Sequence, residues 1–421
     1  MNTALLILIV FLILLTMGLE VGFAVTASAL AAAVMLKIPV AVVAQRYFTA
    51  VDSFSLMAIP LFMVAGSIMS KGSLTKRIID FTLSFMGNVK GALCQVVAIS
   101  GMIMGGISGS GVADTAALGA LLHPEMKRKK YDPEFSAALI AASGSIGLII
   151  PPSVAMIIYG VTTQSSIGDL FIAGIVPGVL ISLAFMLYSF VVAHKEHYPV
   201  EGSSSWAERW DKFKKAIFSL IMPLIIIIGI RGGFFTPTEG GAIISAYALL
   251  VSMFIYKDIK LADLPEIFFD AALSTATIAL IICGTSLLTW ILAYENIPQM
   301  LTQAVLSLTD NKIILIILIQ SILLLTGMVI DSGPAIMLLA PILAPIAKQI
   351  GMSSVQFGLM MVISLTTGLL TPPVGTAMYV SSNISKIPVQ RLAKRLVPFV
   401  LIMTVMSLLI AIFPIFSEIL L

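Results

Sequence analysis

Two proline motifs at corresponding places in the chain carry the residues best suited to bind a ligand. GLIIPPS at 147–153 and GLLTPPVG at 368–375 each interrupt an apolar run that is otherwise long enough for a membrane-spanning helix. Proline has no backbone N–H, its ring clashes with the carbonyl one turn back, and it pushes the preceding residue out of helical geometry. Each motif therefore predicts a broken helix with free carbonyls that must line a cavity or meet an ion. Paired interruptions in two halves of a chain are typical of a transporter's binding site.

Hydroxyl and carbonyl oxygens near these breaks could bind an alkali cation, which needs several oxygen ligands. The first predicted Na⁺ site comprises Ser108, Gly109, Ser110, Ser143, Ser145, Gly147 and Pro151. The second predicted Na⁺ site comprises Asp331, Ser332, Gly333, Thr366, Gly368 and Thr371. Substrate contacts are expected from Ser110, Asp114, Pro152, Asp331 and Pro373. The alternative interpretation is that these small residues only allow close helix packing, as Gly, Ser and Thr do in membranes.

Two carboxylates lie in otherwise apolar surroundings. A charge at the centre of a membrane helix costs about 2.5–3.5 kcal/mol on insertion scales, so packing alone is a poor reason to keep one. We expect Asp331 to lie near a cation or the substrate. Asp114 either binds a ligand directly or caps and orients its helix. Glu20 and Glu239 lie at junctions between apolar segments, where a solvated helix end is the simpler explanation.

The elements that must position these residues belong to a polytopic membrane protein. Of the 421 residues, 59% are hydrophobic and only 11% are charged, whereas soluble proteins carry about 25% charged residues. Met1–Met17 is apolar and lacks a basic start and a cleavage site, which predicts an uncleaved first span. Cys94 and Cys283 have no paired spacing, which excludes a disulfide framework or a Cys metal site.

The polar clusters divide the chain into two predicted repeats of all-α structure. The first, 1–193, contains scaffold helices, an interfacial amphipathic helix at 73–88, a re-entrant hairpin at 91–122 and a broken helix at 133–166. A cytoplasmic connector follows at 194–216, with a capping box predicted at Ser205 and Glu208. The second repeat, 217–421, contains a hairpin at 313–350 and a broken helix at 354–385.

The basic residues decide how the two repeats are oriented. A shift of 221 residues aligns the halves without gaps from about 90 to 183 and keeps both proline motifs in register. The predicted loop at 123–132 is strongly basic, but its counterpart at 345–353 has only Lys348. Conversely, 386–395 is basic and its counterpart at 165–174 has no Lys or Arg. Because basic loops stay in the cytoplasm, equivalent loops are expected on opposite faces, as in an inverted repeat.

The sequence contains no motif for enzymatic catalysis or nucleotide binding. The three histidines lack H-E-x-x-H spacing, and there is no G-x-x-x-x-G-K-[ST] motif, so neither a metalloprotease site nor a P-loop is present. An intramembrane enzyme is an alternative of another class, but the chain lacks a paired catalytic constellation. We therefore expect no enzyme and no cofactor, with Na⁺ as the coupling ion.

The chain resembles the large membrane subunit of tripartite ATP-independent periplasmic (TRAP) transporters. The resemblance covers nearly the whole chain and rests on GGISGSGVADTAALG at 105–119, the two proline motifs, and DSGPAIMLLAPILAP at 331–345. It implies the elevator fold of the ion-transporter superfamily, in which both hairpins and both broken helices move against a scaffold. It also implies Na⁺-coupled uptake of organic acids, such as sialic acid or C4-dicarboxylates, across the bacterial inner membrane.

The same resemblance implies two protein partners. A soluble periplasmic binding protein delivers the substrate, and a small four-helix membrane subunit braces the scaffold. No four-helix segment precedes the large-subunit pattern, so we expect the small subunit to be a separate chain. The alternative is a stand-alone divalent-anion/Na⁺ symporter of related architecture, which would transport without either partner.

Overall fold

The computed structural model describes residues 3–309 and 311–421, so the first two residues of the predicted first span, Met1 and Asn2, lie outside the described residues. The described part is helical throughout and contains no strand. Within it, six helical segments are long and apolar enough to cross a membrane: Phe54–Lys71, Ile167–Lys195, Trp206–Arg231, Pro237–Ile255, Leu261–Tyr294 and Val389–Ile412. The predicted all-α, polytopic fold class is confirmed.

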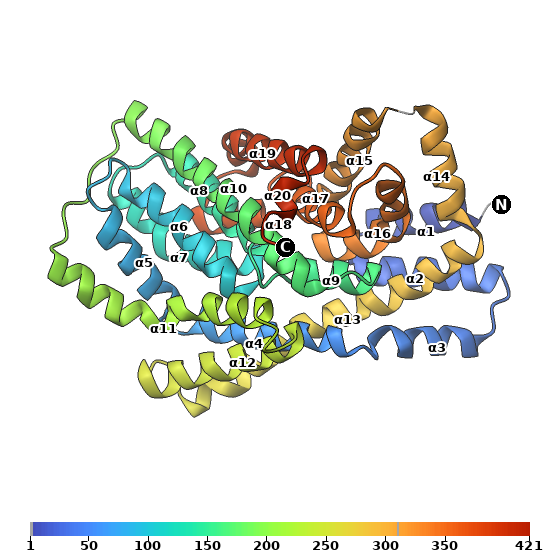
Figure 1. Ribbon diagram of the computed structural model, residues 1–421, viewed down its shortest axis with the longest axis horizontal. Coiled ribbons are helices and arrows are strands. Elements are labelled where there is room, and N and C mark those ends of the chain that lie inside the picture. Colours follow the sequence, from blue (N-terminus) through green and yellow to red (C-terminus); the bar gives the residue numbers. More distant parts are fainter. Residues whose placement is uncertain (1–2, 310) are drawn as a thin grey trace.

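The helices follow one another with short connections (Figure 1). The first half contains α1 (Thr3–Thr16), α2 (Val21–Met35), α3 (Val40–Val51), η1 (Phe54–Met57), α4 (Ala58–Lys71), α5 (Leu74–Met86), α6 (Ala92–Ser108), α7 (Gly111–Arg128), α8 (Pro133–Ser145), η2 (Ile146–Leu148), α9 (Val154–Thr163) and α10 (Ile167–Lys195). The second half contains α11 (Trp206–Arg231), α12 (Pro237–Leu250), η3 (Val251–Ile255), η4 (Leu261–Asp263), α13 (Leu264–Tyr294), α14 (Ile297–Leu308), α15 (Lys312–Gly327), α16 (Ser332–Gln349), α17 (Ser354–Gly368), α18 (Thr376–Ser385), α19 (Val389–Ile412) and α20 (Ile415–Glu418).

Both predicted hairpins and both predicted broken helices are present as pairs of helices. The hairpins are α6–α7 and α15–α16, and the broken helices are α8–α9 and α17–α18. The helix starts repeat with the offset found in the sequence, since α7 begins at Gly111 and α16 at Ser332, 221 residues later. Polar caps start the helices that follow each turn. The Ser110 hydroxyl accepts from the Ala113 N–H, and the Asp331 carboxylate accepts from the Ser332 N–H.

Two predicted boundaries are wrong. The basic run that begins at His123 is not a loop but the last turns of α7, which continues through Pro124 to Arg128. The helix persists because Leu122 and Met126 extend its buried face past the proline. The first hairpin therefore ends beyond residue 122.

The connector also differs from the prediction. The capping box forms as expected, with the Glu208 N–H donating to the Ser205 hydroxyl and the Ser205 N–H donating to the Glu208 carboxylate. The helix then runs to Arg231 without interruption, so the predicted interfacial helix and the next span are one helix, α11. No Gly or Pro intervenes before Pro223 to stop it. Two helices that the sequence did not predict, α3 and α14, flank α13.

The broken helices form the centre of the core. Every residue of α8 from Phe135 to Ser145 is buried, as is every residue of α17 from Gln356 to Gly368. A helix that is apolar all round needs such an environment. We call α6–α9 together with α15–α18 the hairpin body. In Figure 1, α3, α4, α12 and α13 lie along its lower side, and α13 packs against α2, α3 and α4. We call α3, α4, α11, α12 and α13 the scaffold.

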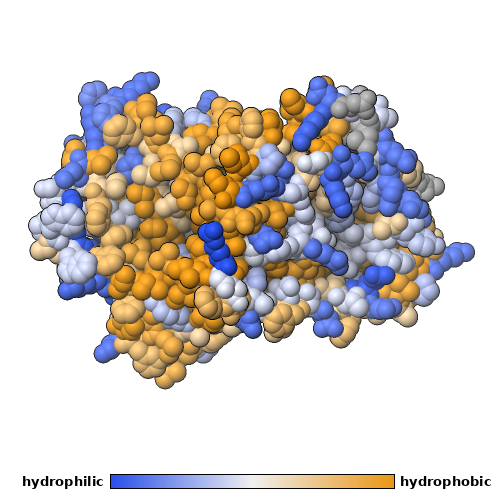
Figure 2. Space-filling view, in the orientation of Figure 1, coloured by the Kyte–Doolittle hydropathy of each residue, from blue (hydrophilic) through white to orange (hydrophobic). Residues whose placement is uncertain are grey.

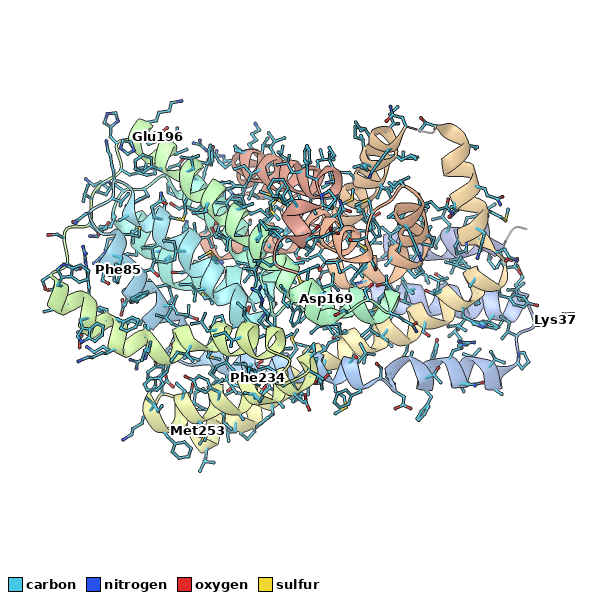
Figure 3. All side chains as sticks on the ribbon, viewed as in Figure 1. Lys37, Phe85, Asp169, Glu196, Phe234 and Met253 are labelled. Atoms are coloured by element: carbon cyan, nitrogen blue, oxygen red, sulfur yellow. The ribbon has the colours of Figure 1, made fainter. Side chains whose placement is uncertain are left out.

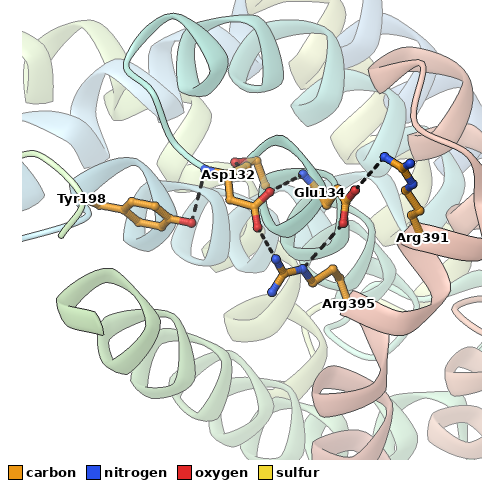
Figure 4. Close-up of polar contacts among 6 residues, drawn as sticks. Asp132, Glu134, Tyr198, Arg391 and Arg395 are labelled. Atoms are coloured by element: carbon orange, nitrogen blue, oxygen red, sulfur yellow. Dashed lines mark hydrogen bonds and ion pairs between the residues drawn. The ribbon is translucent and has the colours of Figure 1, made fainter. Parts of the chain in front are cut away.

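The two broken helices run in opposite directions. At one end, Arg395 of α19 pairs with the Asp132 carboxylate at 2.7 Å, and Arg391 lies 3.6 Å from the Glu134 carboxylate (Figure 4). The start of α8 thus lies beside the end of α18. At the other end, the Tyr159 hydroxyl of α9 donates to the Ser354 carbonyl at the start of α17. This antiparallel arrangement is the one expected of an inverted repeat.

The segments predicted to be cytoplasmic lie together. Lys129 forms an ion pair with Glu201 at 2.7 Å, and the Gly91 N–H donates to the Pro199 carbonyl. Burial raises the pKa of Tyr198, whose hydroxyl accepts from the Asp132 N–H at 3.3 Å (Figure 4). Figure 3 shows Phe85 and Glu196 at this connector end and Lys37 at the opposite end. Figure 2 shows an apolar area across the left and central part of this face, bordered by hydrophilic residues at both ends.

Candidate functional site

The first hairpin tip lies directly against the first proline break. Gly109 has φ +62°, a left-handed conformation that glycine adopts without strain. A Cβ at Gly109 would come within 2.8 Å of the Pro152 carbonyl oxygen, and a Cβ at Gly105 would come within 2.6 Å of the Gly147 Cα. Only glycines allow this approach, so they bring backbone oxygens of the break to the hydroxyls of the tip. Gly105, which the sequence did not single out, is as important to the contact as the predicted Gly109 and Gly147.

Several oxygens at this first site are buried. Ser108 and Ser110 both lie at the tip, where their hydroxyls accept hydrogen bonds from backbone N–H groups of the turn. Asp114 is 1% exposed and packs against Gly147, and its Oδ2 atom has no hydrogen-bond partner among the described residues. The hydroxyl of Ser145 donates to the Ala142 carbonyl at 2.7 Å, which leaves its lone pairs available.

One predicted residue of the first site contacts α6 further from the tip. Ser143 faces Gly101, where an added Cβ would come within 3.0 Å of the Ser143 Cβ. Gly101 precedes Gly105 by four residues of helix, about 6 Å along α6. The structure thus brings Ser108, Gly109, Ser110, Ser145, Gly147 and Pro151 near one another, with Pro152 and Asp114 beside them. Ser143 lies one turn away along α8, and its buried hydroxyl has no hydrogen-bond partner among the described residues.

The second hairpin also meets the second break through a close contact of two glycines. A Cβ at Gly368 would overlap the backbone of Gly327, and the Val374 N–H donates to the Met328 carbonyl at 3.0 Å. The Thr366 hydroxyl is fully buried and has no partner among the described residues. The Thr371 hydroxyl donates to the Gly368 carbonyl at 2.9 Å.

The tip of the second hairpin is more open than the first. Asp331 is exposed, Ser332 is buried, and an added Cβ at Gly333 would meet only the Ile158 side chain of α9. Pro372 and Pro373 are also exposed. Of the predicted second-site residues, Thr366, Gly368 and Thr371 therefore lie at the buried side of the break, whereas Asp331 faces the surface.

Each hairpin also packs against the broken helix of the other repeat. Helix α16 contacts α9, and α18 contacts α7 and α8. The Ser381 hydroxyl of α18 donates to the Ala137 carbonyl of α8 at 2.7 Å. Neither Ser381 nor Tyr159 was singled out from the sequence, because such pairings join residues more than 190 positions apart. They hold the two repeats together as one body.

A polar cavity of about 370 Å³ opens between the first tip and the scaffold. Ser108 and Ser110 line it from the tip, and an ion pair between Lys71 of α4 and Glu266 of α13 lies at its edge. We call it the tip cavity. Its scaffold wall, which the sequence did not reveal, includes Ser67, Ser70, Asp270 and Ser274. Of the predicted substrate residues Ser110 lines this cavity, whereas Asp114, Pro152, Asp331 and Pro373 do not.

Paired hairpins and broken helices that meet inside a membrane protein define a secondary transporter. Residues 8–416 match the family model described as "Tripartite ATP-independent periplasmic transporter, DctM component". The chain belongs to this family, which makes it a transporter subunit and not an enzyme, with a multi-pass location in the inner membrane. The predicted resemblance is confirmed.

Two curated relatives show how close the similarity is. The chain is 38% identical to the "Sialic acid TRAP transporter large permease protein SiaM" of Vibrio cholerae over 405 residues, which cover 96% of this chain and 95% of the relative. It is also 38% identical to the "2,3-diketo-L-gulonate TRAP transporter large permease protein YiaN" of Escherichia coli, over 86% of each chain. The crystal structure of the Alcanivorax borkumensis YdaH transporter shares the fold, with a TM-score of 0.65, 14% identity and coverage of 89% of this chain and 88% of that one.

Proposed function

We propose that this chain is the permease subunit of a Na⁺-coupled importer of organic acids. The observation that carries the proposal is the contact of each hairpin with a proline break, where buried oxygens have no hydrogen-bond partner among the described residues. The sialic acid and 2,3-diketo-L-gulonate relatives support a carboxylate substrate. The start of α7 at Gly111, beside the tip cavity, also favours an anion, because helix N-termini carry partial positive charge.

Na⁺ is the coupling ion that suits these oxygens. Burying a polar atom without a hydrogen bond costs about 1–3 kcal/mol, and Asp114 Oδ2 and Thr366 Oγ1 are both in that position among the described residues. A cation near each break would compensate for this cost. The hydroxyls of Ser145 and Thr371 already donate to backbone carbonyls, so they can offer only lone pairs. The packing interpretation explains the glycines but not these atoms.

The way the molecule is divided supports transport by an elevator movement. The cross-repeat contacts of α9 with α16 and of α18 with α7 make the hairpin body one unit. Cavities of about 370 and 480 Å³ separate this body from parts of α13. A loosely packed boundary of this kind allows one body to slide against the other. A small membrane subunit on a separate chain would brace the scaffold, and a periplasmic binding protein would deliver the substrate.

Reconstitution into proteoliposomes tests the proposal. The chain would be inserted with and without the small subunit, and uptake of radiolabelled N-acetylneuraminate and succinate would be measured with Na⁺ or K⁺ outside. We expect uptake only with Na⁺, the small subunit and the ligand-loaded binding protein. Uptake by this chain alone would instead support the stand-alone symporter, and uptake that is equal in K⁺ would exclude Na⁺ coupling.

A further inference from the structure

A second cavity, of about 480 Å³, lies between the hairpin body and the scaffold. Arg46 of α3 and Trp290 of α13 line it on the scaffold side, and Ile158 of α9 and Met337 of α16 line it on the hairpin side. We call it the Arg46 cavity. Its volume is within the range of small-molecule sites. On α13 the nearest lining residues of the two cavities, Ser274 and Ile282, are eight residues or about 12 Å apart. Because they share no lining residue, the two cavities are separate.

The charge of this cavity is positive. Arg46 is the one charged side chain that lines it among the described residues, and no ion pair of Arg46 occurs there. Its guanidinium carbon lies 5.1 Å from the centre of the Trp290 ring, which holds the cation at the wall. The planar guanidinium can bind a carboxylate through two hydrogen bonds. The tip cavity instead has, among the described residues, one lysine, Lys71, against two carboxylates, Glu266 and Asp270.

The other polar groups of the Arg46 cavity are neutral. Thr162, Gln164, Ser286 and Thr289 supply hydroxyl and amide groups. Thr285 also lines the cavity, is 2% exposed, and its hydroxyl has no hydrogen-bond partner among the described residues. A ligand with hydroxyl groups could satisfy such side chains.

We propose that the Arg46 cavity is a second binding site, for a hydroxylated monocarboxylic acid. The single cation matches one carboxylate, and a second carboxylate would lie unpaired beside Ile158 and Met337. The site lies away from the connector end and captures the acid before it reaches the tip cavity. This inference deepens the proposed function and rests on it only for the direction of transport.

A neighbouring groove of about 720 Å³ adjoins the cavity. Val161 and Gln164 line both, and the groove also contains Arg231 and Asp169, the latter labelled in Figure 3. Because Arg231 lines only the groove, Arg231→Gln is a matched control: it removes the same charge without entering the cavity.

The chain carries its own reporter for this site. It has three tryptophans, of which Trp206 and Trp210 are exposed on α11 and Trp290 lines the cavity. In a Trp206→Phe/Trp210→Phe background, tryptophan fluorescence comes from Trp290 alone. N-acetylneuraminate, succinate and the neutral sugar N-acetylmannosamine would be titrated at constant Na⁺ into the purified full chain in lipid nanodiscs.

We expect a saturable change in Trp290 emission with N-acetylneuraminate, at least tenfold weaker binding of succinate, and no change with the neutral sugar. Arg46→Gln should raise the Kd at least tenfold, Arg46→Lys less, and Arg231→Gln at most twofold. Ser110→Ala in the tip cavity should leave the Trp290 titration unchanged. An unchanged Kd in Arg46→Gln, equal effects of Arg46→Gln and Arg231→Gln, a signal lost in Ser110→Ala, or no saturable change at all would overturn the proposal.

The uptake assay and the Trp290 titration distinguish failure of the proposed function from failure of the second binding site. If the reconstituted transporter takes up no carboxylate, the importer is wrong, yet the Trp290 titration still decides whether the Arg46 cavity binds the acid. If uptake is normal in Arg46→Gln at every substrate concentration, the capture role is wrong while the importer stands.

Discussion

The two proline breaks have the same motif and each contacts the tip of its own hairpin, but they differ in what surrounds them. Pro151 and Pro152 are buried, and Pro151 lies near Phe171 of α10 and Ile226 of α11. Pro372 and Pro373 are exposed. The same contrast holds for the acidic residues, because Asp114 is buried and the Asp331 side of the second tip is open.

The difference shows that equal local sequences can have unequal roles. At the first site Asp114 is enclosed by its own chain, while Ser108 and Ser110 line the tip cavity, so an ion held at Asp114 would exchange with solvent only through the tip. At the second site Asp331 has direct access to the surface. We therefore expect changes at the first break to act on folding and ion affinity, and changes at the second to act more on exchange.

The largest effect should come from filling the glycine contact at the first break. Gly105→Val forces side-chain atoms into the Gly147 backbone, 2.6 Å from the position of the new Cβ, and such overpacking costs about 1–3 kcal/mol or more. We expect uptake to be lost and the apparent Tm in detergent to fall by several degrees. Gly333→Val is the control, because its Cβ meets only a side-chain end, Ile158 Cδ1, at 3.3 Å. If Tm falls equally in both variants, the glycine contact at the first break is no tighter than the second hairpin tip.

The two carboxylates offer the next comparison. Asp114→Asn keeps the shape of a buried side chain and removes its charge, so the Na⁺ concentration for half-maximal uptake should rise at least tenfold. Asp331→Asn removes a charge at the more open tip, and should raise the Na⁺ concentration for half-maximal uptake no more than about threefold. Na⁺ titration of uptake at saturating substrate measures both. A larger effect at Asp331 would reverse the assignment of the enclosed site.

How far the sequence predicted the structure depends on the kind of information each feature needs. The proline breaks, the hairpin turns and the Ser205 cap follow from local backbone rules, and the structure has them where they were expected. The course of α7 past Pro124 depends on burial of Leu122 and Met126, which a local rule about proline cannot supply.

The same limit applies to the candidate site. The tip and break residues were found from their polarity inside apolar runs. Ser143 has that polarity too, yet it packs on Gly101 because helix rotation decides which side a residue faces. The scaffold walls formed by Lys71 and Arg46 come from segments without any motif, so only the fold could bring them to the cavities.

Neighbouring threonines give a smaller and sharper test at the second break. Thr366 has a buried hydroxyl without a partner among the described residues, whereas the Thr367 hydroxyl donates to the Ile363 carbonyl at 2.7 Å. Thr366→Val should raise the Na⁺ concentration for half-maximal uptake about threefold to tenfold. This corresponds to the loss of one oxygen ligand that contributes roughly 1 kcal/mol to Na⁺ binding. Thr367→Val should leave it within twofold. If Thr367→Val has the larger effect, the hydroxyl of Thr366 is not a ligand.

The smallest effect is expected where the repeats meet at the connector end. Arg395 is half-exposed and lies 2.7 Å from Asp132 and 3.8 Å from Glu134, so Arg395→Gln should change stability by no more than about 1 kcal/mol. The ion pair is instead a test of geometry, because it forms only if the start of α19 lies beside the start of α8. In Asp132→Cys/Arg395→Cys, a short bifunctional maleimide should link the two positions within one chain, while Ser354→Cys/Arg395→Cys should stay unlinked. Equal linking of both pairs would contradict the antiparallel arrangement, and with it the premise that the two breaks face different surroundings.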